Sequence, residues 1–224
     1  MKITAPTLPA RFWQRFWIML AGILCMGFFL SFLRAVGWGT DPYTFMNESI
    51  RLRLGWTLGN WQLLLNAVLF VLVVVVNRRL IGLGTVANWV LIGYTADFCN
   101  WLWTRCIPAA VFADAGFLWL KAAIFAAALF GFVVSAAVYM NAKLGLSPYD
   151  ATAALVSAAL PRLPFAPVRI AYDALAVVVG LAVTAGTGIN LRGWLLGTLC
   201  MAVALGPAIQ LVGAFMQKHV FGGE

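Results

Sequence analysis

The chain has 224 residues, of which 63% are hydrophobic and only 10% are charged, whereas a typical soluble protein carries about 25% charged residues. A soluble fold of this length could not bury so much apolar side-chain surface, so the composition predicts an integral membrane protein. The net charge of +8 does not indicate nucleic-acid binding, because the basic residues stand singly or in pairs at the ends of apolar runs.

Six apolar stretches are long enough, or nearly so, to cross about 30 Å of hydrocarbon as a helix, which takes about 20 residues. They are residues 13–35, 58–77, 84–104, 117–140, 167–185 and 191–214. Most of the tryptophans lie at the ends of these stretches, as in the aromatic belts of membrane proteins. The first stretch is too long for a secretory signal and no small-residue cleavage site follows it, so we expect an uncleaved first span. The sequence therefore predicts one all-α membrane domain over residues 1–224.

The chain consists of two related halves, approximately residues 12–105 and 116–215. Gly39-Thr40-Asp41-Pro42-Tyr43 is matched 106 residues later by Gly145-Leu146-Ser147-Pro148-Tyr149. A second match joins three glycines of each half: Gly82, Gly84 and Gly93, and then Gly186, Gly188 and Gly197. Because each half holds three predicted spans, the second half should cross the membrane in the opposite direction to the first. Such inverted three-helix repeats are common among transporters.

Each half is predicted to place a short, more polar helix between its first and second spans. Asp41 and Ser147 are good caps for these helices, and Pro42 and Pro148 suit the first helical position. Asp150 completes an S-x-x-D capping box in the second half. Each helix runs for about 12 residues, which reaches only about 18 Å at 1.5 Å per residue. We therefore expect the short helices to lie in the membrane interface or to re-enter the membrane without crossing it.

The two helix starts allow two interpretations. The free N–H groups and partial positive charge of a helix N-terminus could bind an anionic group or a substrate carboxylate. Alternatively, the capping residues only end one segment and begin the next, and capping accounts for every residue at these positions. Both interpretations stay open at the level of the sequence.

Polar residues inside the predicted spans are the main candidates for function, because a charge at the centre of a spanning helix costs at least about 2.5 kcal/mol. Asp173 and Arg169 lie one helical turn apart in the fifth stretch. At an offset of 107, the corresponding residues of the second stretch are Asn66 and Gln62. These residues could face a shared central cavity. The alternative is that Arg169 extends to the interface and only pairs with Asp173 at i,i+4.

Asp97 is a further candidate, in the third stretch and about two helical turns from its outer end. By the offset of the glycine match, the equivalent residue of the second half is Met201. This carboxylate therefore breaks the repeat. A role on a solute path and a hydrogen bond between two helices are both open for it.

The sequence shows no signature of an enzyme. Its sole histidine, His219, stands near the C-terminus, and no H-E-x-x-H, G-x-S-x-G or phosphate-binding loop occurs. The cysteines have no C-x-x-C spacing and are expected to be buried, unreactive thiols: Cys25, Cys99, Cys106 and Cys200. We therefore expect no enzymatic activity, no cofactor and no metal.

The distribution of basic residues indicates the orientation. If all six stretches span, nine of the 15 Lys and Arg residues fall on the side of the N-terminus, and Lys and Arg are more frequent in cytoplasmic loops. The bias is small, as expected for two opposed halves. It predicts that the N-terminus and the C-terminus are both cytoplasmic.

The order of several short motifs resembles that of one family of bacterial membrane proteins. Gly55-Trp56-Thr57-Leu58-Gly59-Asn60-Trp61 opens the second stretch, Gly82-Leu83-Gly84-Thr85 precedes the third, and Gly93 and Asp97 form a Gly-x-x-x-Asp element. This order is similar to the YczE-like branch of the YitT/YczE proteins, although Asp41-Pro42 stands where that branch has a small residue and Trp followed by Asp. The resemblance implies a multi-pass inner-membrane protein of unassigned activity, in a family sometimes linked with production or export of secondary metabolites. It carries over one site residue, Asp97.

Two functions fit these features. The first is a small transporter or permease-like protein of unknown substrate. Its path would be lined by Asp173, Arg169, Asn66 and Asp97. The second is an accessory protein that stabilises or assembles a partner complex, for which the Gly193-x-x-x-Gly197 step would matter more than the polar residues. The expected surroundings are the lipid bilayer; a small-molecule substrate belongs to the first function, and a homo- or hetero-oligomer is compatible with both.

Overall fold

The computed structural model describes residues 11–189 and 191–219, and every secondary-structure element in these ranges is helical. The long helices are α1 (Phe12–Val36), α3 (Leu58–Asn77), α4 (Leu83–Cys106), α6 (Leu118–Asn141), α8 (Phe165–Thr184) and α9 (Leu195–His219). The shorter ones are α2 (Pro42–Leu54), α7 (Pro148–Ala159) and the single turn α5 (Ala110–Ala113). The long helices coincide with the six predicted stretches, with the largest shifts in α9.

Four helices in the described part of the chain are both long and apolar enough to cross a membrane, namely α1, α3 with the turn that follows it, α6 and α8. α9 is a fifth if its parts Leu195–Val203 and Leu205–Met216, which meet at 42°, form one span. Pro207 explains this bend, because its nitrogen has no hydrogen to donate to the carbonyl one turn earlier. α4 has 24 residues but is interrupted by polar residues such as Asn88 and Asp97. The apolar helices are consistent with a multi-pass membrane protein.

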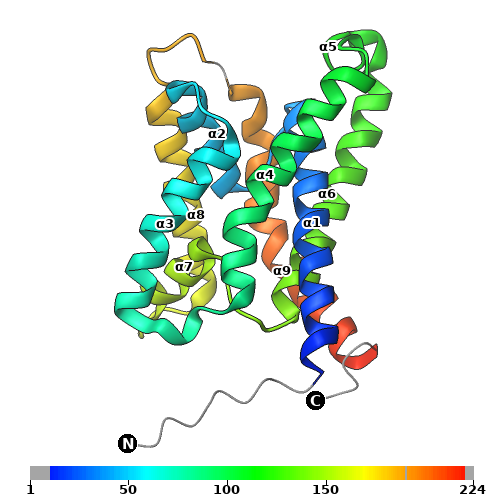
Figure 1. Ribbon diagram of the computed structural model, residues 1–224. Helices are drawn as coiled ribbons and strands as arrows, with labels where there is room; N and C mark the ends of the chain where they lie inside the picture. The colour runs from blue at the N-terminus through cyan, green and yellow to red at the C-terminus, as the bar shows by residue number, and fades with distance from the viewer. Residues whose placement is uncertain (1–10, 190, 220–224) are drawn as a thin grey trace, which may run out of the picture.

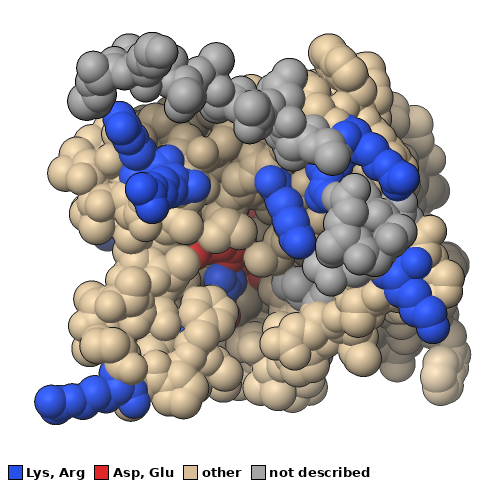
Figure 2. Space-filling model, turned by 90° about the horizontal axis from the view of Figure 1, so that it is seen from below, with Lys and Arg blue, Asp and Glu red and all other residues tan. Residues whose placement is uncertain are grey.

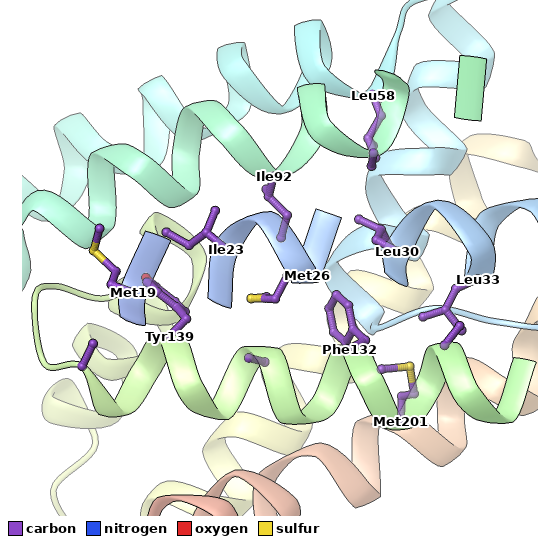
Figure 3. Packing of buried hydrophobic residues seen from close by; sticks show 14 of the residues in the cluster. Met19, Ile23, Met26, Leu30, Leu33, Leu58, Ile92, Phe132, Tyr139 and Met201 are labelled. Atoms are coloured by element: carbon purple, nitrogen blue, oxygen red, sulfur yellow. The ribbon is translucent and has the colours of Figure 1, made fainter. Parts of the chain in front are cut away.

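α1 lies in an apolar group of helices, with α4 on one side and α6 on the other (Figure 3), and α9 packs against α6. Met19, Ile23 and Leu30 of α1 have no exposed surface. Gly22 lets the backbone of α6 approach, since a Cβ there would lie 2.9 Å from the nitrogen of Tyr139. Lipid is as apolar as these side chains, so close van der Waals packing is what holds this group together.

The other group consists of α2, α3, α7 and α8 (Figure 1). α2 packs mainly on α8, and α7 on α3, so each short helix is held by a long helix of the other half. The short helices lie toward opposite ends of the molecule (Figure 1), and their first turns meet where the rings of Tyr43 and Tyr149 stack with centroids 4.3 Å apart. Most residues in the first two turns of both helices are buried. The short helices therefore start inside the bundle and do not lie on its surface.

The predicted caps of the short helices are confirmed. Asp41 Oδ1 accepts a hydrogen bond from Thr44 N at 3.0 Å, and Ser147 Oγ accepts one from Asp150 N at 3.0 Å. A proline follows each cap. The carboxylate of Asp150 accepts a hydrogen bond from the Ser147 hydroxyl at 2.6 Å. In a complete capping box it would accept from the backbone N–H of Ser147 instead. This arrangement leaves the other carboxylate oxygen of Asp150 for a partner outside its own turn.

Glycines allow the extended segments before α2 and α7 to cross the starts of two long helices. A Cβ on Gly197 of α9 would lie 2.2 Å from the carbonyl oxygen of Trp38. At the start of α4, a Cβ on Gly82 would lie 2.2 Å from the carbonyl oxygen of Leu144. No side chain fits at such distances, so the two close crossings require glycine.

The glycines of the second match in the sequence do not make corresponding contacts. Gly186 and Gly188, expected to correspond to Gly82 and Gly84, have no atom within 4 Å of an added Cβ. Thr198 of α9 instead accepts a hydrogen bond from the segment before α2, at 3.3 Å. A similar contact is made in α4 by Thr85, whose hydroxyl lies against the segment before α7. The two threonines stand 113 residues apart and the two crossing glycines 115 apart, so these contacts give no single register for the repeat.

Three of the four cysteines are exposed, contrary to the expectation from the sequence. They are Cys25, Cys106 and Cys200, whereas Cys99 is buried, and all four are free thiols. A helix that faces lipid exposes apolar side chains, so an apolar sequence around a cysteine does not indicate burial within the protein.

Candidate functional site

Two tyrosines mark the place where α2 and α7 begin. The hydroxyl of Tyr43 donates to Asn66 Oδ1 at 2.6 Å, and that of Tyr149 donates to Asp173 Oδ1 at 2.8 Å. The stacked rings join these two pairs. The structure thus brings Asn66 and Asp173 into one site, through tyrosines that the sequence analysis did not single out. The sequence feature that could have identified these tyrosines is their position as the last residue of each repeated motif.

Arg169 links two carboxylates in this site. Its Nε donates to Asp173 Oδ2 at 3.0 Å, and its Nη1 donates to Asp150 Oδ1 at 2.5 Å. The guanidinium carbon lies 5.2 Å from the ring centroid of Tyr149, a cation–π distance. The expected i,i+4 pair of α8 therefore forms and also reaches the start of α7. We call Asp150, Arg169 and Asp173 the α7 cluster.

The α7 cluster is open to solvent from one end of the molecule. The side chains of Arg169 and Asp150 are 23% and 19% exposed, and that of Asp173 is 6% exposed. Figure 2 views the end at which α1 begins, and it shows acidic atoms at the bottom of a hollow with Lys and Arg residues around it. One guanidinium serves two carboxylates, so the cluster has one negative charge in excess.

Asp41 adds a third carboxylate near this cluster. It is 8% exposed, and the electrostatic repulsion of Asp150 and Asp173 reaches it. Its Oδ1 caps α2, but its Oδ2 has no hydrogen-bond partner among the described residues. A buried carboxylate oxygen without a donor is costly. A bound proton or another cation would neutralise the excess negative charge of this region.

The first half carries neutral amides where the second half carries charges. Gln62 stands one turn before Asn66 on α3, as Arg169 stands one turn before Asp173 on α8. Gln62 is 1% exposed, and its Oε1 has no hydrogen-bond partner in the described part of the chain. It lies beside Gly93, where an added Cβ would be 2.7 Å from that oxygen. The candidate site is therefore built from related positions with unequal charge.

Asp97 lies apart from the α7 cluster and joins three helices. Its Oδ2 accepts from Gly59 N at 2.6 Å, and its Oδ1 accepts from Leu58 N at 3.3 Å and from Arg34 Nη1 at 3.0 Å. Gly93, one turn earlier, allows the close approach, since a Cβ there would lie 2.8 Å from Gly59 Cα. The Gly-x-x-x-Asp element thus binds the start of α3 to α4. Of the two interpretations of Asp97, a hydrogen bond between two helices is the one that describes this contact.

A second charged cluster lies near the end of the molecule where α5 is found (Figure 1). Arg34 Nε pairs with Glu48 Oε1, and Arg51 Nε donates to Glu48 Oε2 at 2.6 Å. The side chains of Glu48 and Arg34 are 1% and 5% exposed. We call these three residues the α2 cluster. The sequence analysis missed it, although Glu48 and Arg51 are spaced i,i+3 on a predicted helix.

The sequence profile of a family of unknown function (DUF6198) matches residues 13–214. The chain belongs to this family. No curated protein and no solved structure matches the chain. The DUF6198 match includes both charged clusters, both stacked tyrosines and Asp97, so the whole candidate site lies within the region that defines the family.

Proposed function

We propose that the protein is a small transporter or permease-like protein whose solute passes the α7 cluster. The observation that carries this proposal is the meeting of two half-length helices inside the molecule, marked by Tyr43 and Tyr149, beside charged groups that are partly open to solvent. Transporters often bind substrates where interrupted helices start near the middle of the membrane. Ionisable groups at that depth are costly and mark solute or proton paths.

The proposal includes six spans arranged as two inverted repeats. In support, α1 and α6 lie side by side and run in opposite directions (Figure 1). In addition, α2 packs against α8, and α7 packs against α3 in a corresponding way. α4 is too polar to qualify as a span by its average composition, but Thr85 and Asn88 are buried inside the protein. Polar residues that face the protein do not prevent a helix from spanning.

We place the protein in the bacterial cytoplasmic membrane with both termini cytoplasmic, and we relate it to the YczE-like branch. The motif order supports the relationship. The Lys and Arg residues around the hollow in Figure 2 support the orientation, because α1 begins and α9 ends at this end. On this proposal the protein is not an enzyme, and its partners are lipid and a small molecule.

The charge of the site favours a positively charged solute or coupling ion. The α7 cluster has one negative charge in excess, and Asp41 adds a carboxylate oxygen without a donor. Buried negative charge is stabilised by a cation or by protonation. Proton coupling through these carboxylates is therefore part of the proposal, and a neutral or cationic metabolite is the expected substrate class.

The test is uptake by purified protein in liposomes, with thermal stabilisation measured for the same panel of cationic and neutral metabolites. The matched variant is Arg169→Gln with Asp173→Asn, which gives α8 the amides that α3 carries at Gln62 and Asn66. We expect at least one metabolite to be taken up, and the double variant to lose uptake while it still folds. Folded protein that neither takes up nor is stabilised by any member of the panel contradicts the proposal.

The second candidate is a membrane accessory protein that assembles a partner complex. The observation that favours it is the pairing of Arg169 with both aspartates, since a satisfied cluster can serve structure alone. Gly197 is not available to contact a partner protein, because this glycine packs against Trp38 of the same chain. Cross-linking that recovers one stoichiometric partner, together with full function of Asp173→Asn and Asp97→Asn, would favour this candidate.

A further inference from the structure

A cavity of about 370 Å³ lies beside the α2 cluster, away from the proposed transport site. Such a volume is within the range of pockets that bind small molecules. Its wall includes all three residues of the α2 cluster, and most of the remaining wall is apolar. Trp103, Phe112 and Trp194 provide three aromatic side chains. The cavity therefore combines a charged patch with a large apolar surface.

The charged patch has unused hydrogen-bond donors. Each carboxylate oxygen of Glu48 lies in an ion pair, one with Arg34 and the other with Arg51. Arg51 uses its Nε for this pair, and its two terminal nitrogens have no partner among the described residues. Its side chain is 23% exposed. Asp97 also pairs with Arg34, but it faces the start of α3 and does not line the cavity. With Asp97 counted, the charges of this region cancel, so the wall offers an anion the two free terminal nitrogens of Arg51 and not a net positive charge.

We propose that this cavity binds an amphipathic organic anion. Its carboxylate or phosphate accepts hydrogen bonds from the terminal nitrogens of Arg51, which suit planar oxyanions. Its apolar part packs against the aromatic wall formed by Trp103, Phe112 and Trp194. Glu48 fixes the Nε of Arg51 and so orients the rest of the guanidinium. The ligand can be a soluble metabolite or the headgroup of an anionic lipid, because both carry an oxyanion on an apolar body.

This inference does not depend on transport through the α7 cluster, and binding alone tests it. Calorimetry on the purified full chain in detergent would compare 3-phenylpropionate with its amide and with 3-phenylpropylamine, which share one apolar body. We expect the acid to bind about tenfold more tightly than the amide, and the amine not to bind. Dihexanoyl phosphatidate would test the lipid source. Binding of the acid supports a soluble ligand, and binding of phosphatidate alone supports a lipid. Equal affinity for acid and amide with no binding of phosphatidate overturns the proposal.

Matched variants assign the anion to its site. Arg51→Gln removes the donors, and Arg53→Gln is its control, because Arg53 is exposed on the same helix and does not line the cavity. We expect about tenfold weaker binding for the first and less than twofold change for the second. Equal losses in the two variants would show that the anion binds elsewhere and would overturn the proposal.

A second variant keeps the ion pairs intact, in case Arg51→Gln does not fold. Ala109→Trp places a bulky side chain on the cavity wall, and Ala110→Trp is its control, since Ala110 is exposed next to it but does not line the cavity. Binding should be lost in the first variant and retained in the second. Full binding by Ala109→Trp contradicts the assignment.

Discussion

In the α2 cluster one glutamate pairs with two arginines, whereas in the α7 cluster one arginine pairs with two aspartates. Each cluster involves one of the two short helices, and these helices occupy corresponding places in the two halves (Figure 1). The α2 cluster offers free arginine donors, although Asp97 also neutralises Arg34, whereas the α7 cluster has one carboxylate in excess. We infer that this difference assigns an anion to the cavity near α5 and a cation to the hollow at the other end.

The clusters also differ in burial. Glu48, the shared partner of the α2 cluster, has a side chain that is 1% exposed, whereas the side chain of Arg169 is 23% exposed. Loss of a buried partner leaves the remaining charges unpaired in a medium of low dielectric constant, and water reduces that penalty at an exposed site. The two shared residues should therefore differ in their importance for stability.

The largest effect is expected for Glu48→Gln. The variant leaves Arg34 and Arg51 with a neutral amide between them, so unfolding should require about 3–5 kcal/mol less free energy. Reversible unfolding in mixed micelles measures the change. Asp114→Asn, at an exposed position, should stay within about 0.5 kcal/mol of the parent protein. A loss below about 1 kcal/mol for Glu48→Gln would remove the proposed contrast between the clusters.

Arg169→Gln should have a smaller effect, about 2–3 kcal/mol, because water reaches the cluster. Adding Asp173→Asn should recover at least half of that loss, since it removes one of the two carboxylates left without a positive charge beside them. Arg162→Gln, exposed at the same end, is the control. A double variant that is less stable than the single one would show that the hydrogen bond from Tyr149 to the Asp173 carboxylate stabilises the fold more than the unpaired charge destabilises it.

Two glycine variants test whether the scaffold is equal at the two ends. Gly82→Ala and Gly197→Ala would each place a Cβ 2.2 Å from a backbone carbonyl oxygen of a crossing segment. Each should lower stability by about 1–3 kcal/mol. Gly206→Ala is the control, since an added Cβ meets nothing within 4 Å there, and a helical alanine is favoured by about 1 kcal/mol. Very different losses at the two ends would break the comparison of a shared scaffold.

The smallest contrast is that between Tyr149→Phe and Tyr43→Phe. The first removes a hydrogen bond to the carboxylate of Asp173, and the second removes one to the amide of Asn66. Bonds to charged groups contribute about 1.5–3 kcal/mol and neutral ones about 0.5–1.5 kcal/mol. Tyr149→Phe should therefore cost about 1 kcal/mol more in the same unfolding assay. A reversed order would contradict the difference in charge between the two sites.

Features that depend on neighbouring residues could be predicted from the sequence. The long helices follow from apolar runs of about 20 residues, and the caps follow from Asp41-Pro42 and Ser147-Pro148. The pairing of Arg169 with Asp173 follows from their i,i+4 spacing. Average composition does not distinguish a spanning helix whose polar residues face the protein from a helix that does not span. For this reason α4 counts as a span only in the proposed architecture.

Contacts between distant segments could not be predicted. Arg34 and Asp97 are 63 residues apart, and nothing near either residue indicates the other. The stacking of Tyr43 and Tyr149 requires that the two short helices start at the same place, which a repeated motif alone does not imply. The glycine match did not indicate which glycines make close contacts, because a Gly-x-Gly pair also recurs by chance in a chain with 21 glycines.

Thiol labelling at position 150 tests most directly the claim that a solute path reaches the α7 cluster. Asp150→Cys would be made in a chain without its four native cysteines and exposed to a membrane-impermeant thiol reagent on either side of sealed vesicles. Arg162→Cys and Arg53→Cys report the two surfaces. We predict that residue 150 reacts from the side on which residue 162 reacts, and from that side only. No reaction from either side, or reaction only from the side of residue 53, would contradict the account.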